Sequence, residues 1–131
     1  MNLLGIDYGT KNIGLAINNG TEIAFPFRAV ASGDDALGEI KDVCDEENID
    51  KIIIGRPTKM NRTEGALAGE IKEFAAKIKE ATGKPVAFED EIFSSAQAGK
   101  MMADYGGKYE KDAIEACVIL QSYLDKEYAK D

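Results

Sequence analysis

The sequence predicts a single α/β domain over residues 1–131, built as a mixed sheet with helices packed on it. Three observations predict this class. The chain opens with three extended stretches in succession, which favours an antiparallel meander. Apolar residues then recur at helical spacing, at Leu37, Ile40, Val43 and Cys44. From there to the end, extended and helical patterns alternate, which indicates strands joined by helices.

The opening meander is predicted from its apolar runs and its turns. Tyr8-Gly9-Thr10 supplies the first tight turn, and Asn18-Asn19-Gly20 supplies the second. Proline cannot donate a backbone hydrogen bond, so Pro26 favours an edge or a bulge. The three predicted strands are residues 2–8, 11–18 and 21–30.

The later elements are predicted from period, caps and breakers. Asn61 and Ser94 have the form of helix N-caps, and Gly83 and Gly106-Gly107 are stop signals. The β-branched run Ile52-Ile53-Ile54 suits a strand buried on both faces. The expected order is helix 37–44, strand 52–54, helix 61–82, strand 85–88, helix 94–105 and a last helix from Glu110.

Composition restricts the chemistry. The chain has 131 residues and no His, so imidazole catalysis and imidazole ligation are excluded. Its apolar runs are too short to span a bilayer, and its start lacks the pattern of a signal peptide, so we expect a cytoplasmic protein with no membrane partner. Cys44 and Cys117 lie at apolar helical positions, and buried thiols are favoured there over a disulfide.

The net charge of −8 is concentrated in one segment. Residues 34–50 contain eight acids and one base, a net charge of −7, which leaves −1 for the rest of the chain. Residues 51–63 hold four bases and no acid: Lys51, Arg56, Lys59 and Arg62. This polarity permits phosphate binding despite the acidic total, while the acidic segment is typical of a solvated helix face.

Carboxylates stand at structurally special places. Asp7 ends an apolar strand, where a lone charge is costly without a partner such as a metal ion or a phosphate-bearing ligand. Asp112 lies in the first turn of the last helix, where helix capping and catalysis are both open. Because ligands gather at the carboxyl ends of strands in open α/β sheets, the strand ends and this helix are expected to converge.

Two further acidic positions have alternative interpretations. Glu89-Asp90-Glu91 follows the last predicted strand, and taken alone this triplet is typical of a solvated turn. Glu115 follows Asp112 by three residues and shares its helix face, so it is a further candidate ligand, although a solvent-facing side chain is the simpler interpretation.

Together these carboxylates favour a site for Mg²⁺ or Mn²⁺, since both ions prefer oxygen ligands. Two such ions about 3.5–4 Å apart can activate water and stabilise the leaving oxygen of a phosphodiester. The loop from Arg56 to Arg62 joins a buried strand to a helix N-terminus, where backbone amides and basic side chains can hold phosphate. Lys11, next to the Asp7 turn, is a further candidate for phosphate contact.

Four segments, taken in order along nearly the whole chain, resemble the YqgF family of bacterial RNase-H-like proteins. Members of that family are described as Holliday junction resolvases and as pre-16S rRNA 5′-end nucleases. The resembling segments are Gly-Ile-Asp-Tyr-Gly-Thr-Lys-Asn-Ile-Gly-Leu-Ala at 5–16, Ile53-Ile54-Gly55-Arg56-Pro57, Asp90-Glu91 with Ser94-Ser95, and residues 112–121.

The resemblance implies an RNase-H-like three-layer fold, with a five-stranded sheet that is antiparallel and then parallel and with helices on both faces. It implies Asp7, Glu91 (or Asp90) and Asp112 as metal-binding catalytic carboxylates. Two departures stand out. Ile92 replaces the family's Arg, whose phosphate contact is then lost or supplied by Arg56 or Arg62, and the loop reads Asn61-Arg62-Thr63, where relatives usually carry Asp-Gly-Ser or Thr. In addition, Glu115 replaces a small residue.

The expected function is therefore a metal-dependent endonuclease on structured RNA or branched DNA, with pre-16S rRNA favoured by the family description. Cleavage of DNA four-way junctions and a non-catalytic nucleic-acid-binding module of the same fold stay open, as does a homodimer. A nucleotide phosphotransferase is disfavoured, because such enzymes need two domains of this kind and the chain has no P-loop.

Overall fold

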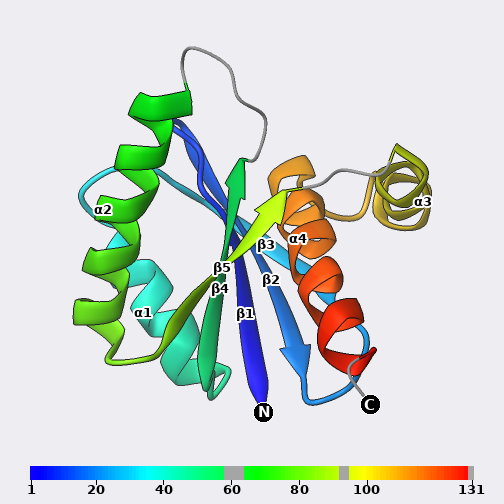
Figure 1. The fold of residues 1–131 in the computed structure, drawn as a ribbon, viewed down its shortest axis with the longest axis horizontal. Helices are drawn as coiled ribbons and strands as arrows, with labels where there is room; N and C mark the ends of the chain where they lie inside the picture. The colour runs from blue at the N-terminus through cyan, green and yellow to red at the C-terminus, as the bar shows by residue number, and fades with distance from the viewer. Residues whose placement is uncertain (58–63, 92–94, 130–131) are drawn as a thin grey trace.

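The computed structural model describes residues 1–57, 64–91 and 95–129. Its centre is a five-stranded sheet with the order β3-β2-β1-β4-β5 (Figure 1). The strands β1, β2 and β3 are antiparallel, and β4 and β5 run parallel to β1, which confirms the predicted mixed sheet. The strand bounds are β1 Asn2–Asp7, β2 Asn12–Asn19, β3 Phe25–Ala31, β4 Lys51–Pro57 and β5 Val86–Glu91.

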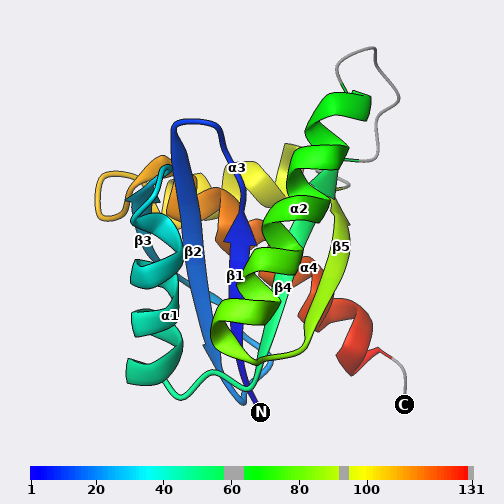
Figure 2. The ribbon, with the colours of Figure 1, turned by 90° about the vertical axis from the view of Figure 1, so that its left-hand side faces the viewer.

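Helices cover both faces of the sheet and make three layers. Helices α1 and α2 lie on one face, and α4 crosses the other, with α3 packed on α4 (Figures 1 and 2). None of the helices in the described part of the chain is long and apolar enough to cross a membrane. The helix bounds are α1 Ala36–Glu46, α2 Glu64–Thr82, α3 Ser95–Tyr105 and α4 Lys111–Tyr128.

The face under α1 and α2 is packed with large aliphatic side chains. Ile52 and Ile54 of β4 are fully buried against the helices, as are Leu4 and Ile6 of β1. Ile53, between them, is equally buried but belongs to the cluster under α4. The β-branched run therefore marks a central strand buried on both faces, as predicted.

Most element boundaries agree with the sequence prediction. Gly83 ends α2 with a positive φ of 70°, and Glu110 precedes α4 in an extended conformation. Pro26 lies in the edge strand β3, opposite a register shift at Leu15/Ala16 of β2. The two predicted N-caps at Asn61 and Ser94 lie outside the described residues.

Two boundary expectations were wrong. The third strand begins at Phe25 rather than Thr21, because the buried Asn18 amide donates to the carbonyls of Thr21 and Ile23 at 2.7 and 2.9 Å and holds a longer turn. The acidic triplet does not follow the strand as a solvated turn. Residues 89–91 complete β5, paired with β4, and Glu89 is buried.

The two cysteines are free and buried, as predicted. Cys44 belongs to the cluster under α1 and α2, whereas Cys117 belongs to the cluster under α4. The sheet separates them, so no disulfide joins them.

Candidate metal centre

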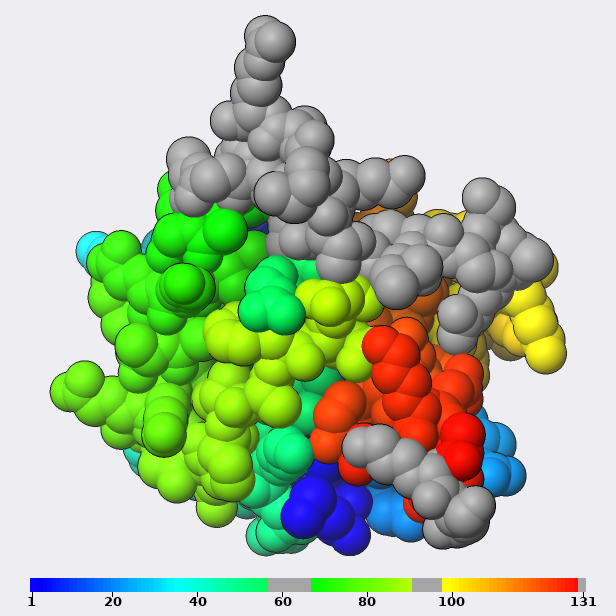
Figure 3. All heavy atoms as spheres, viewed as in Figure 1, coloured from blue at the N-terminus to red at the C-terminus, as the bar shows by residue number. Residues whose placement is uncertain are grey.

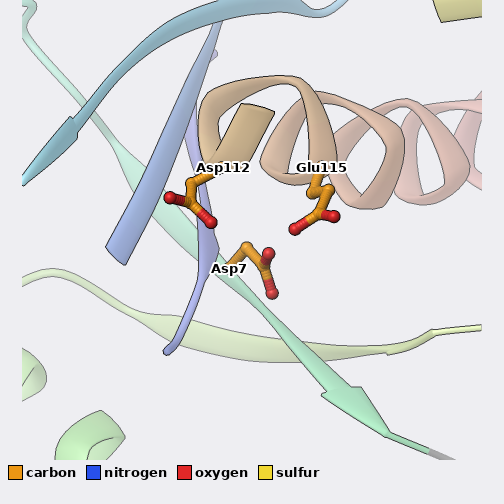
Figure 4. Close-up of side chains that lie close together, drawn as sticks. All are labelled: Asp7, Asp112 and Glu115. Carbon is orange, nitrogen blue, oxygen red and sulfur yellow. The ribbon is translucent and has the colours of Figure 1, made fainter. Parts of the chain in front are cut away.

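Three carboxylates from two elements meet at one end of the sheet. Asp7 ends β1, and Asp112 and Glu115 lie in the first two turns of α4 (Figure 4). One carboxylate oxygen from each lies within 4.8 Å of the others, and all three side chains are half-buried. The structure thus joins Asp7 to Asp112 as the sequence predicted. Glu115, the further candidate ligand, lies in the same cluster and is half-buried.

A glycine opposite Asp7 makes this convergence possible. Asp7 and Gly14 are paired residues of β1 and β2. A Cβ atom on Gly14 would lie 1.9 Å from the backbone oxygen of Asp112, which no side chain can tolerate. The start of α4 therefore rests directly on the backbone of β2, one strand away from Asp7.

The turn after Asp7 is held from β3's side of the sheet. The Ser32 hydroxyl donates to the Gly9 carbonyl at 2.7 Å, and the Ser32 amide donates to the Lys11 carbonyl at 2.9 Å. These bonds fix the backbone of the turn, and the Lys11 side chain is exposed. Its predicted contact with a phosphate stays a prediction.

The electrostatics of the cluster favour a cation. Like charges at this separation repel one another, and partial burial strengthens the repulsion. The donor set consists of carboxylate oxygens, which suit hard divalent ions such as Mg²⁺ and Mn²⁺. The three residues present thus fit a divalent metal ion by donor chemistry and by proximity.

Asp90 and Arg56 lie on the other face of the sheet. The Arg56 guanidinium donates from Nε and one terminal nitrogen to Asp90 Oδ1, at 3.0 and 2.9 Å. It also lies 5.3 Å from the ring centre of Phe88, which packs against the cluster under α1 and α2. The structure therefore does not bring Asp90 to Asp7, and Arg56, a predicted phosphate contact, already holds a carboxylate.

Three predicted site residues cannot be placed by their side chains. Lys59 and Arg62 lie outside the described residues, and for Glu91 the description covers only the backbone. Residue 91 is the last of β5, in register with Pro57 of β4. Their predicted roles remain predictions.

A groove of about 290 Å³ opens between α1 and α2, on the face opposite the carboxylates. Its wall includes Tyr8, whose ring centre lies 4.8 Å from that of Phe74, and its rim carries Glu70, Glu73 and Lys77. The two glutamates and the neighbouring acidic α1 disfavour phosphate in this groove, whereas the carboxylate cluster lies on the opposite face.

Sequence reasoning missed the structural roles of two residues, Gly14 at the site and the buried Glu89 of β5. Gly14 had a usable signal, since a glycine inside an apolar strand often marks a close backbone approach. Glu89 had none, because its neighbours Asp90 and Glu91 gave the triplet the composition of an exposed turn.

The sequence of this chain is similar to one protein family and to proteins from several bacteria. A family model described as "RuvX: Holliday junction resolvase" matches residues 1–126. A protein of Geobacillus kaustophilus is 36% identical over 137 residues, covering 95% of this chain and 98% of its own. One from Streptococcus thermophilus is 36% identical over 140 residues, covering 96% and 99%. Both carry the name "Putative pre-16S rRNA nuclease".

Solved structures share the fold. RuvC of T. thermophilus, in complex with a Holliday junction substrate, superposes with a TM-score of 0.69 at 12% identity, covering 99% of this chain and 97% of RuvC. The fowlpox virus resolvase, in complex with Holliday junction DNA, gives a TM-score of 0.57 at 14% identity, covering 97% and 99%. At these identities the likeness concerns the fold, and the predicted RNase-H-like architecture is confirmed.

Proposed function

Because this chain belongs to the RuvX family of Holliday junction resolvases, we propose that it is a metal-dependent endonuclease acting on structured nucleic acid. The observation that carries the proposal is the cluster of Asp7, Asp112 and Glu115 at the end of the sheet. A chain without histidine has few other ways to activate water, and clustered carboxylates are sufficient for phosphodiester hydrolysis when they hold divalent ions.

The three carboxylates are proposed to hold Mg²⁺ or Mn²⁺. A bound divalent ion would supply the activation of water and the stabilisation of charge on the scissile phosphate. Asp7 is the central ligand, because it alone comes from the sheet and faces both acids of α4 (Figure 4). The backbone contact at Gly14 keeps α4 at this distance without the entropy cost of ordering a loop.

Glu91 is proposed as a further ligand, in preference to Asp90. Residues alternate between the two faces of a strand, and Glu89 contacts α4 while Asp90 lies on the opposite face. Because Arg56 holds Asp90 on that face, Glu91 is the remaining candidate of the pair. Lys11, Lys59 and Arg62 are proposed to contact the phosphate backbone, together with Arg56 if substrate displaces its bond to Asp90.

The substrate is proposed to be precursor 16S rRNA, processed at its 5′ end. Relatives that match nearly the whole chain carry the name of pre-16S rRNA nucleases. Cleavage of a four-way DNA junction is the second candidate, favoured by the description of the family model. We place the activity in the cytoplasm, where two buried free thiols stay reduced.

The proposal is tested by Mn²⁺-dependent cleavage of a pre-16S rRNA fragment and of a four-way DNA junction in parallel. Asp7→Asn keeps the size of the side chain and removes the charge. It is expected to lower the cleavage rate at least about a hundredfold, since a metal's charge stabilisation contributes several kcal/mol. Mn²⁺ binding, measured by calorimetry, should weaken in the same variant.

Asp42→Asn is the matched control, because Asp42 is an exposed acid of α1 that undergoes the same chemical change. It should cleave and bind Mn²⁺ as the wild type does. Cleavage that is unaffected by Asp7→Asn would show that the assigned site is wrong. Binding of either substrate without cleavage in any divalent metal would favour a non-catalytic module.

A further inference from the structure

Glu89 is the one carboxylate that is buried among the described residues, with 5% of its surface exposed. Its Oε2 accepts from Lys126 Nζ at 2.7 Å and from the Ser122 hydroxyl at 2.9 Å. A buried carboxylate is costly unless it is both ion-paired and hydrogen-bonded, and here it is both. Glu89 belongs to β5 and its two partners to α4, so the contact joins these elements. Figure 3 shows the side chains of β5 and of the C-terminal half of α4 meeting at the surface.

The partners of Glu89 lie on the same stripe of α4 as Glu115. Ser122 and Lys126 follow Glu115 by seven and eleven residues. At about 100° per residue, both return to within about 20° of its direction. The stripe that contributes a carboxylate to the metal centre is therefore the one that is attached to β5.

Asp7 and Glu89 also lie in line with each other across neighbouring strands of the sheet. Ile6 pairs with Ile54, so Asp7 falls beside Gly55, and Gly55 pairs with Glu89. Asp7 and Glu89 thus belong to one row of the sheet, two strand spacings or about 10 Å apart. The stripe of α4 meets this row twice, with Glu115 near Asp7 and with Ser122 and Lys126 at Glu89.

The opposite flank of α4 is also attached by a polar side chain. Gln121 accepts from the Ala24 amide at 2.9 Å and donates to the Glu22 carbonyl at 2.8 Å. Between these flanks, α4 packs on the sheet through Ala116, Cys117, Leu120 and Leu124. The close approach at Gly14 sets the distance of α4 from the sheet, and the two polar attachments hold its flanks.

We propose that Glu89 is a positioning residue for the metal centre. Through Lys126 and Ser122 it holds α4 against β5, which keeps Glu115 within reach of Asp7. This inference rests on the proposed function, because it assigns Glu89 a part in the affinity of that site for its divalent ion. Glu89 does not touch the ion itself.

The test measures Mn²⁺ affinity by calorimetry in Glu89→Gln and Lys126→Met. A positioning role predicts that both variants bind Mn²⁺ about three- to tenfold more weakly. If the two side chains acted only through their charges, the variants would change Mn²⁺ affinity in opposite directions. Removing the lysine charge would strengthen cation binding, and removing the glutamate charge would weaken it. Lys126→Met is therefore the decisive variant, and Mn²⁺ binding at or above wild-type affinity in it would overturn the proposal.

Three further variants separate positioning from folding. Lys126→Arg keeps the cation and should bind Mn²⁺ within twofold of wild type. Lys41→Met breaks an exposed ion pair with Asp45 on α1, and should leave the affinity unchanged. Ser122→Ala changes no charge and should weaken Mn²⁺ binding about twofold. If circular dichroism shows that Lys126→Met is unfolded, Ser122→Ala becomes the decisive variant. Wild-type Mn²⁺ affinity in Ser122→Ala would then overturn the proposal.

Asp7→Asn in the same assay distinguishes this inference from the proposed function. If Asp7→Asn abolishes Mn²⁺ binding while Lys126→Met does not weaken it, the positioning role is wrong and the metal centre stands. If Asp7→Asn binds Mn²⁺ as the wild type does, the metal centre itself is wrong.

Discussion

The two faces of the sheet bury similar strands in different ways. Under α1 and α2, large aliphatic side chains such as Ile6, Ile40 and Ile78 fill the space between sheet and helices. Under α4 the sheet presents Gly5 and Gly14, and the helix comes so near that a Cβ on Gly5 would lie 2.7 Å from Leu120 Cβ.

The two faces therefore have different roles: the α1–α2 face stabilises the fold, and the α4 face positions the carboxylates. Interdigitated aliphatic side chains contribute most of the hydrophobic free energy, and they tolerate small adjustments of a helix. The close contact of α4 with the sheet backbone at Gly5 and Gly14 allows almost no such adjustment. The carboxylates that must stay within a few ångströms of one another lie on the α4 face, where the glycines and the attachments at Glu89 and Gln121 fix the helix.

The strongest test of this separation removes a large side chain from the α1–α2 face. Ile52 is fully buried, and Ile52→Ala is expected to lower the free energy of unfolding by about 2–5 kcal/mol, from lost burial and the cavity left behind. Urea denaturation measures this loss. Below the transition, Mn²⁺ affinity should stay within twofold of wild type. A large loss of affinity in the folded variant would show that the two faces are coupled.

Gly14→Ala is expected to lower the free energy of unfolding less than Ile52→Ala does, but to weaken Mn²⁺ binding much more. In Gly14→Ala the new Cβ meets the Asp112 carbonyl, so the start of α4 must move. The free energy of unfolding should fall by about 1–3 kcal/mol, as for overpacked sites. Mn²⁺ affinity should fall at least about tenfold, because Asp112 moves away from Asp7.

Gly38→Ala is the matched control for that change. Gly38 lies in α1, where an added Cβ meets nothing within 4 Å. Alanine is the better helix former, so this variant should gain about 0.5–1 kcal/mol and bind Mn²⁺ normally. Wild-type affinity in Gly14→Ala would mean that the close approach does not position the site.

The features that were predictable from sequence are those carried by local patterns. The meander followed from apolar runs and Gly- or Asn-containing turns, and α4 from its apolar spacing after Glu110. Asp7 and Asp112 could be paired because both stand at element ends, which the topology of an open α/β sheet brings together. The resemblance of whole segments then fixed the three-layer arrangement.

The features that were missed depend on contacts between distant elements. Burial of Glu89 requires Lys126, and nothing local to residues 89–91 indicates that partner. The ion pair between Arg56 and Asp90 likewise joins two strands far apart in sequence, and it pairs one candidate ligand with one candidate phosphate contact. Glu115 was assigned two interpretations, and only the crossing of α4 over β1 brings its carboxylate near Asp7.

The two buried thiols allow the burial of the two faces to be compared, since Cys44 lies under α1 and α2 and Cys117 lies under α4. Burial raises the pKa of Cys44 to about 11, with a further contribution from Asp45, and burial alone raises the pKa of Cys117 to about 12. An unfolded thiol has a pKa of about 8.5. Above that pH the unfolded chain loses protons that the folded protein keeps, so the free energy of unfolding falls as pH rises. Each thiol contributes a slope of about 1.4 kcal/mol per pH unit until its folded pKa is reached.

Urea denaturation between pH 8.5 and 11 therefore tests the burial of the thiol on each face when each cysteine is replaced in turn. Cys44→Ala and Cys117→Ala should each flatten the fall in stability over this range, because each folded thiol keeps a proton that the unfolded thiol loses. A Cys117→Ala protein with the wild-type slope would mean that water reaches the α4 interface, and the close contact that places Asp112 and Glu115 would then be looser than the packing at Gly5 and Gly14 requires.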